Sequence, residues 1–211
     1  KGGYALKQGL LIWDLDDTLI IINREYEKTN QECAEIVSEA IFGSSKETES
    51  ILERQRKHDL AMVLQYGFVR PRYLHSWLRT LEEFSKKYNV KISGSTIQKV
   101  ADAVNDLYRR KFDNVPGATE VLTELKNEGY SMIVLTAGGE EVQHKRIKDA
   151  GISEFFEAVY VYPFKTPEIL KEVLSNYEGQ IHFMIGNLLR SDIYPALENN
   201  VGAIHVIRET W

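Results

Sequence analysis

The chain has 211 residues, of which 43% are hydrophobic and 27% charged, a composition typical of a globular protein with a sizeable core. Its formal net charge of -5 comes from 31 acidic and 26 basic residues without a basic block, so we expect no nucleic-acid partner. No apolar run approaches the about 20 residues that span a bilayer, and the first residues, KGGYALKQG, lack the apolar centre of a signal peptide. The single cysteine, Cys33, excludes an internal disulfide. These features predict a cytoplasmic protein without a membrane partner.

Apolar runs of strand type alternate with helical patterns in the first and last parts of the chain. The runs lie at 10–15, 130–136, 157–162, 181–186 and 201–207. Helical patterns lie between the later runs, at 118–125, around 140–150, and after Thr166 and Pro167, which suit an N-cap and a first helical position. This alternation predicts an α/β fold, a Rossmann-like parallel sheet with helices on both faces.

Residues 21–112 interrupt this alternation and contain no convincing strand. Their apolar positions step by three and four in three clear patterns and one looser pattern, which predicts a bundle of four amphipathic helices with Cys33 in its core. We therefore expect an α/β core domain made of residues 1–20 and 113–211, with a helical cap domain of residues 21–112 inserted after the first strand. Open α/β sheets bind ligands at the carboxyl ends of their strands, so a cap inserted there is placed to act as a lid.

The first apolar run is followed by clustered carboxylates in the stretch LLIWDLDDTL, where Asp14, Asp16 and Asp17 fall within four positions. One interpretation is a polar turn that ends the strand. The other is a metal and phosphate site, because clustered carboxylates at the mouth of a ligand crevice need a compensating cation. A metal and phosphate site requires further phosphate-binding or metal-binding groups at the ends of the later strands, whereas a polar turn does not.

The second strand end, VLTAGG, offers the hydroxyl of Thr136 and the backbone N–H groups of Ala137 and Gly138 ahead of a helix, an arrangement that favours a bound phosphate. After the third run, Lys165 in YPFKTPE precedes a capped helix start and is a candidate fixed cation. Taken alone, the Thr136 motif is more typical of an ordinary loop, and Lys165 is more typical of a solvated surface lysine.

The fourth strand end, IGNLLRSDI, places Asn187 and Asp192 on one loop, where each can give an oxygen to a hard cation. The alternative is a turn in which Ser191 or Asp192 caps the next helix. Because all four strand ends carry such groups, the metal and phosphate interpretation is favoured.

In order and spacing, DLDDT, LTAGG, FKTPE and GNLLRSD resemble the four motifs of the haloacid dehalogenase-like hydrolase superfamily. The segment VPGATEVLTELKNEGY at 115–130 is similar to the one that leads into its second motif. The closer resemblance is to its phosphatases with an inserted helical cap. It implies an Mg²⁺-dependent phosphatase that hydrolyses a small phosphorylated metabolite, such as a sugar phosphate or nucleotide, through an aspartyl-phosphate intermediate.

The resemblance also implies a role for each motif residue. Asp14 is the nucleophile, and Asp16 is the general acid and then the base, with its carbonyl helping to hold the metal. Asp17 and Thr18 are expected to shape the turn. The implied phosphate-binding residues are Thr136, Ala137, Gly138 and Lys165, of which Thr136 and Lys165 also assist catalysis. The implied Mg²⁺ ligands are Asp14, Asp16 and either Asn187 or Asp192. Family members often have an acidic residue at the position of Asn187. This chain departs from the family pattern there, which lowers the formal negative charge around the implied metal by one.

Other functions remain open at this point. A phosphomutase needs the same motifs, and a ligand-binding protein without turnover could keep the fold, with Asn187 as a first sign of lost catalysis. Asp16 argues against a 2-haloacid dehalogenase. The cap residues Tyr26, His58, Arg70 and Arg72 are candidates for selecting the leaving group, each with a structural alternative. The remaining expectation is a monomer or homodimer that acts on a small phosphate ester.

Overall fold

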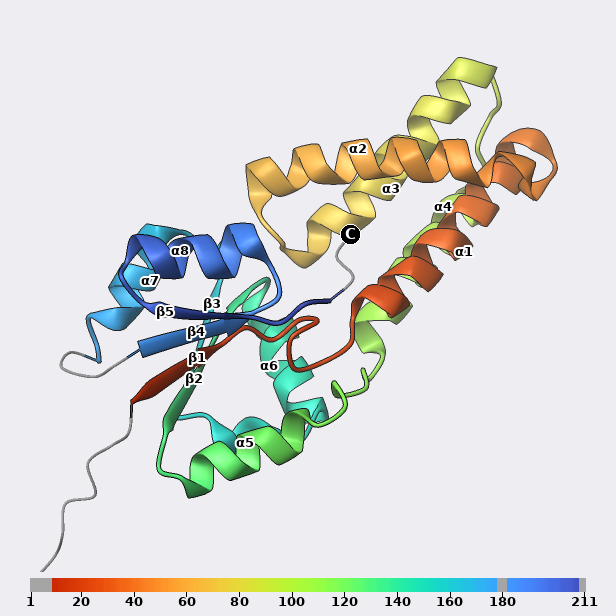
Figure 1. Ribbon diagram of the computed structural model, residues 1–211. Coiled ribbons are helices and arrows are strands. Elements are labelled where there is room, and N and C mark those ends of the chain that lie inside the picture. The colour runs from red at the N-terminus through yellow and green to blue at the C-terminus, as the bar shows by residue number, and fades with distance from the viewer. Residues whose placement is uncertain (1–8, 178–181, 209–211) are drawn as a thin grey trace, which may run out of the picture. The chain divides into compact units, whose positions relative to one another are not determined.

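The computed structural model describes residues 9–177 and 182–208, and the chain divides into two compact units (Figure 1). The α/β unit comprises Lys1–Asn23 and Lys111–Trp211, and the helical unit comprises Arg24–Arg110. The expectations for residues 1–8 and for Ile181, the first residue of the fourth predicted run, lie outside the described residues. Each unit is described below by itself.

The α/β unit is built on a parallel sheet of five strands within the described residues. The strands are β1 (Leu10–Trp13), β2 (Ser131–Ala137), β3 (Ala158–Tyr162), β4 (His182–Gly186) and β5 (Gly202–His205). Their order is β3-β2-β1-β4-β5, and every neighbouring pair is parallel. Each strand overlaps the apolar run predicted for it, so the predicted parallel sheet is confirmed.

Strand β1 lies at the centre of the sheet, and all four of its side chains are buried. Helices α7 (Pro167–Leu174) and α8 (Tyr194–Glu198) lie on one face, and α5 (Ala118–Asn127) and α6 (Glu140–Asp149) lie on the other (Figure 1). The core of the first face contains Leu10, Ile12, Ile133, Leu135, Leu170, Val173, Met184, Ala196 and Val201. Helices on both faces, as predicted, explain why β1 is hydrophobic at consecutive positions.

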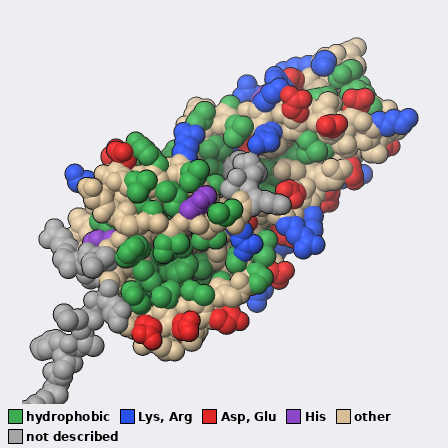
Figure 2. Space-filling model, viewed as in Figure 1, with side chains coloured by type: hydrophobic (Ala, Val, Ile, Leu, Met, Phe, Trp, Pro, Cys, Tyr) green, Lys and Arg blue, Asp and Glu red, His purple; other side chains and the backbone are tan. Residues whose placement is uncertain are grey.

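The face that carries α5 and α6 is only partly covered by the described residues. An apolar groove of about 580 Å³ lies beside α5 and includes Leu11, Trp13, Phe183, Ile185 and Ile204 in its lining. Figure 2 shows this area as a continuous group of hydrophobic side chains over strands β1, β4 and β5. Within residues 9–177 and 182–208, the β4 and β5 side of this face therefore carries no helix.

The helical unit contains the four predicted helices. They are α1 (Asn23–Phe42), α2 (Thr48–Tyr66), α3 (Arg70–Tyr88) and α4 (Gly94–Arg109). Cys33 and Trp77 are fully buried in the hydrophobic interior of this unit, and burial raises the pKa of the Cys33 thiol to about 12. The thiol stays protonated at neutral pH, which agrees with the predicted core role of Cys33.

No helix in the described part of the chain has the length and hydrophobicity that crossing a lipid bilayer requires. The cytoplasmic location stays a prediction.

Candidate active site

The predicted site residues follow the carboxyl ends of the strands. Asp14 directly follows β1, Thr136 and Ala137 end β2, and Asn187 directly follows β4. The N–H of Asp14 donates to the carbonyl of Ile185 at 2.9 Å, which continues the pairing of β1 with β4 and fixes the position of Asp14. Because parallel strands end at the same edge, the sheet gathers these residues in one place.

Lys165 lies between two carboxylates. Its Nζ donates to Oδ1 of Asp14 and to Oδ1 of Asp192, and all three side chains are buried. The other oxygen of Asp192 accepts the backbone N–H of Leu188 at 2.9 Å. Both oxygens of Asp192 are therefore held by protein donors, and one of those donors is the predicted cation Lys165.

The second oxygen of Asp14 is held by Thr18, whose Oγ1 donates to Oδ2 at 2.7 Å. We expected Thr18 to shape the turn, and its hydrogen bond to the proposed nucleophile is a contact that the sequence did not predict. A hydroxyl four residues after a strand-end aspartate was the available signal. Thr18 and Lys165 together fix the orientation of the Asp14 carboxylate.

Burial raises the pKa of Asp14 to about 7; the Asp192 carboxylate acts in the same direction, whereas Lys165 and Thr18 oppose the rise. Burial by itself lowers the pKa of Lys165, but Asp14 and Asp192 outweigh that effect and raise it. Two carboxylates and one ammonium leave a negative charge in excess at a buried position, which is costly without a further cation or proton. This charge balance suits a divalent cation.

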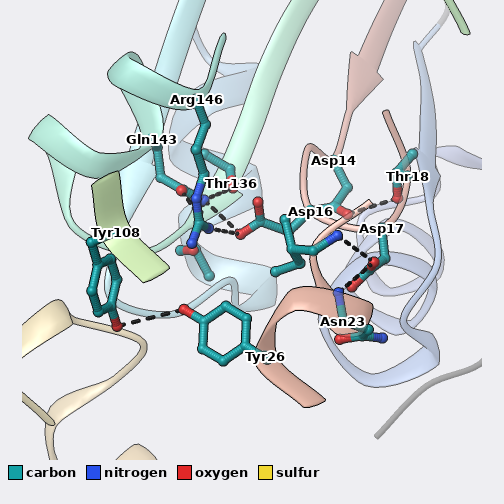
Figure 3. Close-up of polar contacts among 12 residues, drawn as sticks. Asp14, Asp16, Asp17, Thr18, Asn23, Tyr26, Tyr108, Thr136, Gln143 and Arg146 are labelled. Atoms are coloured by element: carbon teal, nitrogen blue, oxygen red, sulfur yellow. Dashed lines mark hydrogen bonds and ion pairs between the residues drawn. The ribbon is translucent and has the colours of Figure 1, made fainter. Parts of the chain in front are cut away.

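Asp16 faces helix α6. Its Oδ2 accepts from Arg146 Nη1 at 2.7 Å and from Gln143 Nε2 at 3.0 Å, and Figure 3 shows its carboxylate directed toward both residues. Its Oδ1 is buried and has no hydrogen-bond partner among the described residues. One carboxylate oxygen of Asp16 is thus anchored, and the other is available.

The second strand end differs from the prediction at Gly138. Its N–H donates to the carbonyl of Tyr162 at 2.8 Å, so this donor is engaged in pairing with the end of β3, whereas the sequence suggested an unobstructed N–H for phosphate. What Gly138 does provide is space, because a Cβ there would lie 3.0 Å from Cγ and Cδ of Gln143. Thr136 is buried, and its Oγ1 accepts from Gln143 Nε2 at 2.6 Å.

Asn187 has the donor atom best suited to a metal ion on the fourth strand end. Its Oδ1 is buried and has no hydrogen-bond partner in the described structure, and its backbone carbonyl accepts from His205 Nε2 at 3.0 Å. The described residues contain no group of three His, Cys, Asp or Glu side chains arranged for a metal ion. A cation here would therefore rely on Asp14 together with the amide oxygen of Asn187 and the backbone carbonyl of Asp16, an all-oxygen set that suits Mg²⁺.

Gly186 allows Asp192 to approach the end of β4. A Cβ at Gly186 would lie 2.4 Å from Cγ and Oδ2 of Asp192, so only glycine fits without movement of that loop. The residues between Asn187 and Asp192 run into a π-helical turn, Leu189–Ile193, which turns the Asp192 carboxylate toward Lys165. The sequence left open which of Asn187 and Asp192 would hold the metal. In the described structure Oδ1 of Asn187 has no hydrogen-bond partner, whereas both oxygens of Asp192 accept hydrogen bonds.

Asp17 shapes the turn after β1, as expected. Its backbone is left-handed, with φ 59°, and its Oδ1 accepts the N–H groups of Ile22 at 2.9 Å and Asn23 at 3.1 Å (Figure 3). The carboxylate therefore satisfies free donors where α1 begins.

Two of the four candidate selectivity residues are engaged inside the helical unit. His58 Nε2 contacts Glu83 Oε2 at 2.7 Å, and Arg72 pairs with Asp59 at a buried position. The guanidinium of Arg72 thereby links the first turn of α3 to α2. These contacts give His58 and Arg72 structural partners.

The other two candidates share a third residue. The Arg70 guanidinium lies 5.0 Å from the ring centroid of Tyr108 and donates to Asn105 Oδ1 at 3.0 Å. The hydroxyl of Tyr26 donates to that of Tyr108 at 3.5 Å. Tyr26 and Arg70 thus meet at Tyr108 within the helical unit, and a role in selecting substrates stays a prediction.

Sequence reasoning missed Gln143 and Arg146, which hold Asp16. They are three positions apart on α6 and belong to its buried face. Residues at this spacing are neighbours on a helix surface, and two polar residues on a buried helical face directly after a phosphate-type motif were the signal that could have identified them.

Comparison with known proteins places this site in a family. A curated relative from Pyrococcus furiosus, named glyceraldehyde 3-phosphate phosphatase, is 28% identical over 204 residues, which cover 92% of this chain and 77% of that protein. A haloacid dehalogenase-like family hydrolase from Xanthomonas campestris has a similar fold, with a TM-score of 0.78 at 23% identity over 94% of this chain and 82% of that one. The hydrolase YfnB from Bacillus subtilis, solved with magnesium bound, gives a TM-score of 0.62 at 17% identity over 94% of this chain and 88% of that one.

The family model described as haloacid dehalogenase-like hydrolase matches residues 9–193, which include all four motifs. The resemblance drawn from the sequence is thereby confirmed, and the chain belongs to the haloacid dehalogenase-like hydrolase family.

Proposed function

We propose that this protein is an Mg²⁺-dependent phosphatase that hydrolyses small phosphate esters through a phosphorylated Asp14. The observation that carries the proposal is the buried Asp14 carboxylate at the end of β1, held by Lys165 on one oxygen and Thr18 on the other. The name of the Pyrococcus furiosus relative supports a phosphatase and makes glyceraldehyde 3-phosphate the first substrate to test. A three-carbon sugar phosphate falls within the substrate class that the sequence resemblance implies.

The proposed reaction has two steps, each with balanced proton transfer. An oxygen of Asp14 attacks phosphorus, the bond from phosphorus to the ester oxygen breaks, and Asp16 gives its proton to that oxygen. Water then attacks phosphorus of the phosphorylated Asp14, Asp16 takes a proton from the water, the bond from phosphorus to the Asp14 oxygen breaks, and inorganic phosphate leaves. Asp14 and Asp16 return to their starting states.

Lys165, Thr136 and the proposed Mg²⁺ would offset the negative charge of the phosphoryl group. Lys165 and the hydroxyl of Thr136 would bind phosphoryl oxygens, whose negative charge otherwise opposes attack by a carboxylate. Asp14, the carbonyl of Asp16 and Oδ1 of Asn187 would hold Mg²⁺, which supplies further neutralisation of phosphoryl charge. The buried excess of negative charge supports this assignment, and so does Oδ1 of Asn187, which has no hydrogen-bond partner among the described residues.

The test is phosphate release from a panel that contains glyceraldehyde 3-phosphate, glycerol phosphates, hexose phosphates and nucleoside monophosphates. We expect release by the wild-type protein with Mg²⁺ and none with a chelator or with Asp14→Asn. A phosphomutase would instead return an isomeric ester without free phosphate. A binding protein would shift its melting temperature with one of the esters and leave all of them intact, and either result would contradict the proposal.

The proposed metal ligand gives a separate prediction. Asn187→Leu removes the amide oxygen, so we expect the Mg²⁺ concentration for half-maximal activity to rise on the order of tenfold or more, whereas Asn187→Asp should lower it. Ser191→Ala is the matched control, because Ser191 Oγ is another buried oxygen on this loop without a partner among the described residues. Mg²⁺ titrations that give equal shifts for Asn187→Leu and Ser191→Ala would rule out Asn187 as the specific ligand.

A further inference from the structure

Helix α6 presents two polar side chains to the turn after β1. Gln143 and Arg146 are buried, and both donate to the same oxygen of Asp16. We propose that Gln143 and Arg146 are positioning residues that anchor Oδ2 of Asp16, so that Oδ1 is the oxygen that gives and takes the proton. This inference rests on the proposed function, in which Asp16 is the acid and base.

The assignment follows from the chemistry of the two oxygens. Oδ2 already accepts two N–H bonds, and a proton placed on it would point at those donors. In the proposed reaction the proton that Asp16 transfers is therefore carried on Oδ1, which is the oxygen without a partner in the described structure. In the first step the Oδ1–H bond breaks, its electron pair stays on Oδ1, and the proton goes to the leaving oxygen. In the second step Oδ1 takes a proton from water.

The two anchoring side chains hold each other in place. Oε1 of Gln143 accepts from Arg146 Nη1 at 3.0 Å, so the amide nitrogen of Gln143 must face Asp16. The guanidinium of Arg146 lies 5.2 Å from the ring centroid of Phe112, and the missing Cβ of Gly138 leaves room for the stem of Gln143. A rigid donor pair of this kind keeps an acid in one geometry, as efficient proton transfer requires.

Gln143 also links Asp16 to the phosphate-binding residue. Its Nε2 donates to Thr136 Oγ1 at 2.6 Å and lies 3.1 Å from the carbonyl oxygen of Ala137. Because Oγ1 accepts from Gln143, the hydroxyl hydrogen of Thr136 is left to donate to a phosphoryl oxygen. One amide thus orients the acid and the phosphate-binding hydroxyl together.

The test compares kcat/KM for two esters that differ in their need for a proton donor. Phenyl phosphate has a basic leaving oxygen, whereas 2,4-dinitrophenolate leaves without protonation. We expect Arg146→Ala and Gln143→Leu to lower kcat/KM on the order of 10²-fold for phenyl phosphate but about threefold or less for 2,4-dinitrophenyl phosphate. The value of kcat/KM reports only the steps up to and including cleavage of the ester bond. The later role of Asp16 as a base therefore does not affect it. Arg146→Lys should restore part of the loss.

Two controls make the result specific. Lys145→Ala removes a cation from the same helix, where Lys145 pairs with Asp149, and should change neither ester by more than about twofold. Asp16→Asn should reproduce the selective loss, and Arg146→Ala should add little to it, because residues that act as one unit are not additive.

The outcomes separate the inference from the proposed function. Suppose that the wild-type protein hydrolyses both esters and that Arg146→Ala and Gln143→Leu lower kcat/KM equally for the two. Gln143 and Arg146 would then have a merely structural role, and the inference would be overturned. Additive losses in the Asp16→Asn, Arg146→Ala double variant would overturn it as well. A wild-type protein inactive on both esters would overturn the proposed function and the inference together.

Discussion

Asp14→Asn is expected to lower kcat by on the order of 10⁴-fold or more, which is the scale of losing a nucleophile. An amide cannot form the aspartyl-phosphate, yet it has nearly the size of the carboxylate and can still accept the hydrogen bond from Thr18. The measurement is phosphate release with saturating Mg²⁺ and substrate. Asp17→Asn is the matched control, because Asp17 holds the turn through backbone N–H groups and should keep most of the activity.

The same substitution has a predicted effect on stability that separates lost chemistry from lost folding. Folding raises the pKa of Asp14 from its ordinary 3.8 to about 7, so its contribution to stability is fully present below the ordinary value and is lost as the pH rises through 7. Without divalent cations and above that pH, Asp14→Asn should therefore be at least as stable as the wild type in urea unfolding. A strongly destabilised variant would mean that inactivity reports unfolding.

Lys165→Ala is expected to lower kcat by on the order of 10²-fold or more, because it removes a fixed cation from the place where the proposed reaction develops phosphoryl charge. The substitution also leaves Asp14 and Asp192 buried without their shared counter-ion, which costs about 3–5 kcal/mol of stability. Steady-state kinetics and urea unfolding measure the two effects separately. Lys171→Ala, at an exposed position of α7, is the matched control and should change neither.

A double variant tells a catalytic Lys165 from a structural one. In an Asp192→Asn background, Lys165→Met leaves fewer unpaired buried charges, so stability should recover in part. The activity loss should persist if Lys165 acts on the phosphoryl group. Recovery of activity along with stability, or a single-variant loss of tenfold or less, would contradict a catalytic role.

The sheet and the gathering of the candidate site residues at one edge of it were predictable from sequence because both follow from topology. Buried parallel strands are continuously hydrophobic, as in residues 10–13, and their carboxyl ends must share one edge of the sheet. Asp14 and Lys165 are far apart in the sequence but meet for that reason. Local chemistry was predictable too, since Thr166 caps α7 by accepting the N–H of Ile169 at 3.3 Å.

The pairing of side chains was not predictable, because it depends on how helices pack on the sheet. Nothing local to Asp16 identifies Arg146, which reaches it from α6. The sequence places Asp192 near a metal site, but only the structure shows that both of its oxygens are already bonded. At Gly138, the lack of a side chain suggested a free N–H, whereas the pairing beyond the end of β2 uses it.

The most direct test of the account is detection of a phosphoryl group on Asp14 during turnover. Wild-type protein mixed with substrate and Mg²⁺ would be quenched in acid within one turnover, digested, and analysed by mass spectrometry. The account predicts a hydroxylamine-sensitive phosphoryl group on the peptide that contains Asp14, and none in Asp14→Asn. Turnover by the wild type without phosphorylation of Asp14, or with phosphorylation elsewhere, would contradict it.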